Sequence, residues 1–203
     1  MQLVKPEIKH IESYLRAIEG DWSDVAFEKD PIIKAKKIKD IKNNPKEFLE
    51  LFDDPNAKAL PYLLGDQTIA YAVPSLRRWI WDTKRDQYCG SVSLRWQNGT
   101  TELPYHLMGH IGYCVPPIEQ NKGYASFGLK AILEVASALA LEFVYLVTDS
   151  DNLASQRVIV KNHGILVEQF TKPAMYGDKP ALRFLIPLVE NPIKIVPKST
   201  RNN

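Results

Sequence analysis

The chain has 203 residues, of which 45% are hydrophobic, enough to build one full core but not comfortably two domains. Acidic and basic residues nearly balance at a formal net charge of +2, so the sustained positive surface of a nucleic-acid-binding protein is missing, and we expect no nucleic-acid partner. Two cysteines without metal-ligand spacing, no signal-peptide pattern and no apolar stretch of bilayer-spanning length lead us to expect a cytoplasmic protein without a bound metal or a membrane partner.

The N-terminal part of the chain is expected to hold helices and then the first strands of a sheet. Residues 8–19 and 30–52 show helical patterning, and the second helix is expected to break near Asn44 and Pro45, because proline restricts the residue before it. The lysines along this helix could form a basic binding face or the solvent-exposed side of an amphipathic helix, and we favour the second interpretation. Aromatic and β-branched residues predict the strands, at residues 68–73, 78–82 and 88–96.

A strand over residues 108–115 is expected next, ended by two prolines that remove backbone donors. Before it, Asn98 and Gly99 form a strong tight-turn signal. If this turn closes a hairpin, the strand at residues 88–96 runs antiparallel to the segment at residues 109–115.

A short loop and a long helix follow this strand. The helix has an apolar face of residues spaced three and four apart, which directs its N-terminus back at the loop. Free N–H groups and the partial positive charge at that end suit an anion, and Gly123 lets the backbone come close. Because many strand-to-helix turns contain glycine for steric reasons alone, the loop by itself predicts only anion binding. Its residues are Gln120, Asn121, Lys122, Gly123, Tyr124 and Ala125.

A second motif begins after residues 143–148, a continuous apolar run typical of a buried strand. Asn152 is a good N-cap for a short helix closed by Gly164. Two strands at residues 164–169 and 181–188 are expected to finish the sheet, and the tail from Asn191 is expected to be poorly ordered or loosely docked. The chain has no nucleophile elbow, Walker loop or glycine-triplet dinucleotide motif.

Residues 109–164 resemble the GCN5-related N-acetyltransferase (GNAT) family. Its acetyl-CoA loop reads Gln or Arg, two variable residues, Gly, one variable residue, then Gly or Ala, and Gln120, Gly123 and Ala125 fill those positions. The run from Gly109 to Tyr113 is similar to that of uncharacterised bacterial predicted acetyltransferases. Asn121 departs from the Gly or Arg of many members, which puts one phosphate contact in doubt.

The resemblance implies an α/β fold with a mixed, mostly antiparallel, twisted sheet and helices on both faces. The sheet would be splayed between strands 4 and 5, which end at Val115 and Thr148. It also implies one N-acetyltransferase domain over residues 1–203. The cofactor-binding core would span about residues 88–170, the acceptor side residues 1–87 and the tail residues 190–203.

The resemblance also implies that acetyl-CoA is the cosubstrate and that the acceptor is a small-molecule or peptide amine. The enzyme itself would be a monomer or a homodimer. Backbone amides at residues 120–125 would hold the CoA pyrophosphate, and the strand edge at Cys114 and Val115 would pair with the pantetheine arm. Asn152 and Ser155 would lie beside the pantetheine and phosphates, although helix capping explains both residues equally well.

Direct attack of an amine on the thioester needs a base and, for the leaving thiolate, an acid. His110 is a possible base, since its ordinary pKa suits proton transfer near neutrality, although a lone histidine on a strand is more often structural. Many relatives have a tyrosine that acts as the general acid where this chain has Ile159. In this chain Tyr145, Ser155 or a water is a possible acid, or the thiolate leaves unassisted. Core packing is the favoured interpretation of Tyr145 and of Tyr113. Trp79, Trp81, Trp96 and Tyr105 could line an acceptor pocket, but such residues more often lie in the core.

Two other classes of function stay open. One is a non-catalytic acyl-CoA-binding or regulatory protein that kept the cofactor loop and lost its acid and base, which Ile159 permits. The other is an α/β interaction domain with a coincidental loop, for which no CoA affinity is expected.

Overall fold

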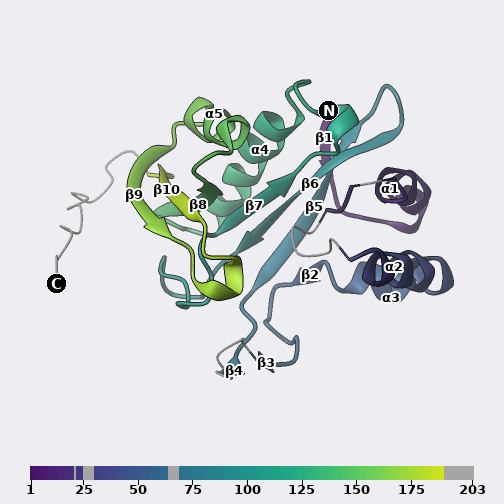
Figure 1. Cartoon of the computed structure of the whole chain (residues 1–203), viewed down its shortest axis with the longest axis horizontal. Coiled ribbons are helices and arrows are strands. Elements are labelled where there is room, and N and C mark those ends of the chain that lie inside the picture. The colour runs from purple at the N-terminus through teal and green to yellow at the C-terminus, as the bar shows by residue number, and fades with distance from the viewer. Residues whose placement is uncertain (21, 25–29, 64–68, 190–203) are drawn as a thin grey trace.

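The fold is described from a computed structural model, which covers residues 1–20, 22–24, 30–63 and 69–189 (Figure 1). The predicted tail from Asn191 and Thr68 of a predicted strand lie outside these described residues. No helix in the described part of the chain is both long enough and apolar enough to cross a bilayer.

The larger sheet has five antiparallel strands, which come from the N-terminal part of the chain. The hairpin of β5 and β6 forms its centre, with β1 and β2 beside β5 and with β7 at the opposite edge. The predicted antiparallel pairing of the strand at residues 88–96 with the following one is thus confirmed. The strands are β1 (Gln2–Val4), β2 (Asp53–Asp54), β5 (Ser75–Asp82), β6 (Gln87–Arg95) and β7 (Ile111–Cys114).

The smaller sheets are also antiparallel. One has the order β8, β10, β9, formed by β8 (Phe143–Asp149), β9 (Ile165–Thr171) and β10 (Pro180–Pro187). The other is a short hairpin of β3 (Tyr62–Leu63) and β4 (Ile69–Ala70). The strand predicted over residues 68–73 is therefore much shorter, since only Ile69 and Ala70 pair.

The two main sheets meet where β7 begins and then separate. The N–H of His110 donates to the carbonyl oxygen of Tyr145 in β8 at 2.8 Å. A Cβ on Gly109 would lie 2.9 Å from the same oxygen, so this approach requires glycine. Beyond this point β7 and β8 share no strand ladder in the described residues, and this separation forms the predicted splay.

Helices cover both faces of the larger sheet (Figure 1). Alternation along β5 sends Trp79 and Trp81 into one core with α1, while Ile80 packs beside Tyr124 of α4 on the other face. Trp96 is buried in the core under α4 and α5, so these three tryptophans are packing residues, whereas Tyr105 is 70% exposed. The helices are η1 (Ile8–His10), α1 (Ile11–Ile18), α2 (Pro31–Asn43), α3 (Pro45–Glu50), η2 (Pro117–Glu119), α4 (Tyr124–Ala138), α5 (Leu153–Lys161) and η3 (Ala174–Tyr176).

The helix boundaries follow local signals in most places. The predicted break at Asn44 and Pro45 separates α2 from α3, and the Asn44 side chain caps α3 by accepting from the Glu47 N–H. Gly164 helps to close α5 as predicted, because its N–H donates to the Ile159 carbonyl oxygen at 2.9 Å. The left-handed residue after α5 is His163, at φ 66°, while a Cβ on Gly164 would lie 2.3 Å from Cγ2 of Ile159. Gly164 therefore serves close packing.

Candidate functional site

A cleft of about 510 Å³ lies where the end of β7 faces the first turns of α4 and α5. It gathers residues from two motifs that are well separated along the chain. Of the residues predicted to bind the cofactor, all except Lys122 line it: Cys114, Val115, Gln120, Asn121, Gly123, Tyr124, Ala125, Asn152 and Ser155.

The loop before α4 presents the start of that helix to the cleft. Gly123 is the N-cap residue at φ 85°, in the left-handed region, and no side chain caps the helix through a hydrogen bond. A Cβ on Gly123 would meet nothing within 4 Å, so glycine is needed there for its backbone angle. Without a side-chain cap, the first-turn N–H groups and the helix dipole are available to an anion in the cleft.

The start of α5 forms the opposite wall. The Asn152 side chain accepts from the Ser155 N–H at 3.0 Å, which confirms the helix cap, and both residues also line the cleft. Arg157, an exposed cation that the sequence analysis did not single out, lines the same wall. Helix α5 therefore adds a positive charge to the cleft opposite the loop.

Tyr113 also faces the cleft, which its interpretation as a packing residue did not include. Its hydroxyl lies 2.7 Å from the Ser155 hydroxyl and donates to the Ser155 carbonyl oxygen at 3.2 Å. Burial raises the pKa of Tyr113 to about 12, so the phenol stays protonated near neutral pH. Alternation from Ile111, a core residue, places Tyr113 on the α5 side of β7 and is the signal that predicts this position.

Cys114 contributes no nucleophile to the cleft. Its Sγ lies 3.1 Å from the Ser91 hydroxyl, and burial raises the pKa of its thiol to about 11. A thiol with this pKa is protonated near neutral pH, and the thiolate is the reactive form.

His110, predicted as a possible base, lies outside this cleft. Its side chain is fully buried, its Nδ1 accepts from the Tyr145 N–H at 2.9 Å, and its Nε2 lies 2.9 Å from the Thr101 carbonyl oxygen. Burial lowers the pKa of His110 to about 4, which keeps the ring neutral. With both nitrogens engaged by backbone groups, the imidazole ties β7 to β8 where the splay begins.

Tyr145, predicted as a possible acid, is not among the residues that line the cleft. Its ring packs 5.0 Å from that of Phe143 and lies under the Arg183 guanidinium, 5.6 Å from the ring centre. Tyr113 and Ser155, by contrast, line the cleft.

The segment between α1 and α2 supplies residues that sequence reasoning missed. Trp22 lines the cleft. Nearby in the chain, the fully buried Asp24 carboxylate accepts from the Tyr14 hydroxyl at 2.9 Å and forms ion pairs with Lys37 at 2.8 Å and Arg77 at 3.5 Å. These contacts tie Asp24 to α1, α2 and β5.

A search for clusters of at least three His, Cys, Asp or Glu side chains that could hold a metal ion finds none among the described residues.

Comparison with solved structures identifies the fold. A ribosomal-protein α-N-acetyltransferase in complex with coenzyme A is 14% identical, with 91% of this chain and 92% of that chain covered and a TM-score of 0.57. A microcin self-immunity acetyltransferase in complex with acetyl-CoA and AMP is 13% identical, with 91% of each chain covered and a TM-score of 0.56. A spermidine N-acetyltransferase from Vibrio cholerae is 15% identical, with 93% and 95% covered and a TM-score of 0.53. At these identities the likeness shows a shared fold.

No curated protein sequence gives a significant match to the chain. The profile of the acetyltransferase (GNAT) domain, however, matches residues 3–164, which is most of the 203 residues and includes the cleft and the segment that carries Trp22 and Asp24. The chain therefore belongs to the GNAT acetyltransferase family.

Proposed function

We propose that the protein is an N-acetyltransferase that transfers the acetyl group of acetyl-CoA to a primary amine. The observation that carries this proposal is the meeting of two distant motifs, residues 120–125 and the pair Asn152 and Ser155, in one cleft at a helix N-terminus without a side-chain cap. The family membership and the solved relatives with bound acetyl-CoA or CoA support the choice of cofactor.

In this proposal the cofactor's pyrophosphate lies on the backbone amides of residues 120–125, with Arg157 as a neighbouring cation. The pantetheine arm runs along the edge of β7 at Cys114 and Val115, whose other edge is paired with β6. Asn152 and Ser155 flank the arm from α5.

The uncharged amine attacks the thioester carbonyl, a C–N bond forms, the C–S bond breaks, and the thiolate leaves while the nitrogen gives up its proton to solvent. Tyr113, shared with Ser155, is the side chain we assign to the departing sulfur. Its pKa of about 12 lies above that of an ordinary thiol, near 8.5, so it stabilises the thiolate by donating a hydrogen bond rather than by transferring its proton. His110 and Tyr145 take no part.

The acceptor is a small-molecule or peptide amine. Among the solved relatives are acetyltransferases named for a ribosomal protein and for spermidine, which represent both kinds of amine. We place its entry on the side of α1 to α3, where Trp22 reaches the cleft. A cytoplasmic monomer or homodimer without a nucleic-acid partner remains the working proposal.

Calorimetric titration with acetyl-CoA, followed by a free-thiol assay with amines of both kinds, tests this function. Amine-dependent thiol release supports the proposal. Binding without release for every amine favours the alternative, a non-catalytic acyl-CoA-binding or regulatory protein. Absence of any acetyl-CoA binding contradicts both.

A further inference from the structure

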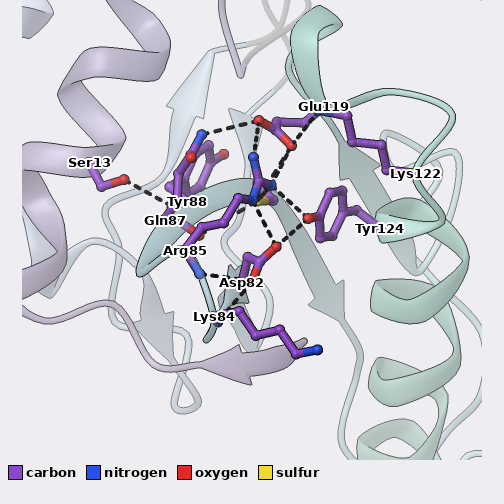
Figure 2. Close-up of polar contacts among 10 residues, drawn as sticks. Ser13, Asp82, Lys84, Arg85, Gln87, Tyr88, Glu119, Lys122 and Tyr124 are labelled. Atoms are coloured by element: carbon purple, nitrogen blue, oxygen red, sulfur yellow. Dashed lines mark hydrogen bonds and ion pairs between the residues drawn. The ribbon is translucent and has the colours of Figure 1, made fainter.

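Arg85, in the turn between β5 and β6, holds both ends of the candidate cofactor loop. Figure 2 shows its guanidinium between Glu119, which directly precedes residues 120–123, and Tyr124, which directly follows them. The contacts span 34 and 39 residues of sequence, so they join the hairpin to the loop across the fold.

The contact with Glu119 is a two-pronged ion pair. The Nη1 and Nη2 atoms of Arg85 lie 3.0 and 2.6 Å from the two carboxylate oxygens, and the Gln87 amide donates to one of them at 3.1 Å. The Glu119 residue is only 2% exposed, and the hydrogen bond from Arg85 holds the pKa of its carboxyl below the usual value. Lys122, within the loop, also pairs with this carboxylate at 3.2 Å.

The contact with Tyr124 is closed by a third group, Asp82. The Tyr124 hydroxyl accepts from Arg85 at 2.6 Å and donates to the Asp82 carboxylate at 2.6 Å. Asp82 in turn accepts from Nε of Arg85 at 2.9 Å and from the backbone N–H groups of Lys84 and Arg85. The guanidinium is thus fixed to its own turn, and the turn is fixed to the first residue of α4.

Between these two anchors lie only the residues of the loop, including left-handed Asn121 at φ 61° and Gly123 at φ 85°. Fixing the ends of so short a segment limits the directions in which its amides can point. We infer that Arg85 is a positioning residue that clamps Glu119 and Tyr124, presets the loop amides and thereby sets the affinity for CoA. This inference rests on the proposed function, because it assigns those amides to the cofactor's phosphates.

The test compares Arg85→Ala with Arg78→Ala. Arg78 is a matched control, since its Nη1 also forms a short ion pair, 2.5 Å from Oδ1 of the partly buried Asp53. This pair joins β5 to β2 and does not contact the loop. For Arg85→Ala we expect the Kd of acetyl-CoA to rise about 10-fold or more, with kcat at saturating acetyl-CoA within about 2-fold, because ordering the loop then costs binding free energy. Arg78→Ala should leave the Kd unchanged.

Two further variants separate positioning from a general loss of stability. In Arg85→Met combined with Glu119→Gln, the buried Glu119 charge is removed together with its partner, and Asp82 keeps its hydrogen bonds from the Tyr124 hydroxyl and two backbone N–H groups. The loop has still lost its clamp on Glu119, so the Kd should stay raised even if the thermal stability recovers. Arg85→Lys keeps the charge but not the planar fork, so its Kd should lie between those of wild type and Arg85→Ala.

Hydrogen exchange of the free protein gives a readout that needs no cofactor. The amides of Gln120 and Phe127 donate to the Pro117 and Gly123 carbonyl oxygens, at the two ends of the loop. They should exchange faster in Arg85→Ala than in Arg78→Ala, whether or not the wild type binds acetyl-CoA. If the wild type fails to bind acetyl-CoA, the proposed function is wrong and this exchange difference still tests the clamp. Equal exchange at the loop in the two variants, or an unchanged Kd in Arg85→Ala, would overturn the inference.

Discussion

Individual side chains at the site are held in one protonation state by burial. The Tyr113 hydroxyl and the Cys114 thiol stay protonated near neutral pH, since burial raises their pKa values to about 12 and about 11. His110 stays neutral because burial lowers its pKa. Of the three, Tyr113 is the side chain that we propose to assign to the departing thiolate.

His110 should make the stability of the protein depend on acid. Its folded-state pKa of about 4 lies below the ordinary 6.5, so the unfolded chain is protonated first as the pH falls. The contribution of neutral His110 to the free energy of unfolding is complete above pH 6.5. It is lost as the pH falls toward 4, and the total loss is about 3 kcal/mol. Urea unfolding between pH 7.5 and 4.5 should show a shallower pH dependence for His110→Asn than for wild type.

The exposed His163 is the control for this prediction, and His163→Asn should keep the wild-type slope. Turnover of folded His110→Asn should keep the wild-type pH profile from about pH 6.5 to 8, the range in which a histidine base titrates. If His110→Asn loses the acidic limb of the profile, where activity falls as a base is protonated, His110 acts as the base after all.

Removing the Tyr113 hydroxyl should slow the chemical step. For Tyr113→Phe we expect kcat to fall about 10- to 100-fold, the order of one hydrogen bond to developing charge, with little change in the Kd of acetyl-CoA. Ser155→Ala, which keeps the phenol, should cost less. Steady-state kinetics with both variants checks this, and a Tyr113→Phe enzyme of wild-type kcat would show that the thiolate leaves unassisted.

At the level of secondary-structure elements, the loop before α4 depends on one backbone angle. Gly123→Ala forces a residue with a Cβ into the left-handed region at φ 85° and should cost about 1–2 kcal/mol of unfolding free energy. Gly99→Ala is a matched control, because Gly99 has a φ of 77° and open space around its missing Cβ, in a turn outside the cleft. Both variants should lose similar stability in chemical unfolding.

Only Gly123→Ala should also weaken acetyl-CoA binding in calorimetry, because strain there shifts the amides of the loop. Equal Kd values for the two variants would mean that the loop backbone does not hold the cofactor.

Elements with local signals could be predicted from the sequence, and contacts between distant segments could not. The break at Pro45, the cap at Asn152 and the strand at residues 143–148 follow from neighbouring residues, and the structure has all three. The Arg85 to Glu119 pair joins a turn to a 3₁₀ helix 34 residues away, so no periodicity indicates it. The partners of His110 could not be predicted for the same reason, since Thr101 and Tyr145 come from two other segments.

For the whole molecule, the cleft lies where the two main sheets separate, between elements that otherwise meet at His110 and Tyr145. A cofactor that contacts both β7 and α5 therefore bridges the splay. Acetyl-CoA at about 100 times its Kd should raise the unfolding free energy by about 2.7 kcal/mol and the Tm by several degrees. Acetyl-pantetheine, which lacks the pyrophosphate, should raise the Tm much less in a thermal scan at equal concentration. Equal Tm shifts for the two ligands would mean that the loop does not bind the pyrophosphate.

Hydrogen exchange of the wild-type protein with and without saturating acetyl-CoA tests the central claim most directly, because it reports on the backbone amides that are assigned to the cofactor. The predicted result is strong protection at residues 120–126 and at Cys114 and Val115, with little change in the turn at Gly99. Protection confined to other segments, or no protection at the loop despite measurable binding, would contradict the placement of CoA in this cleft.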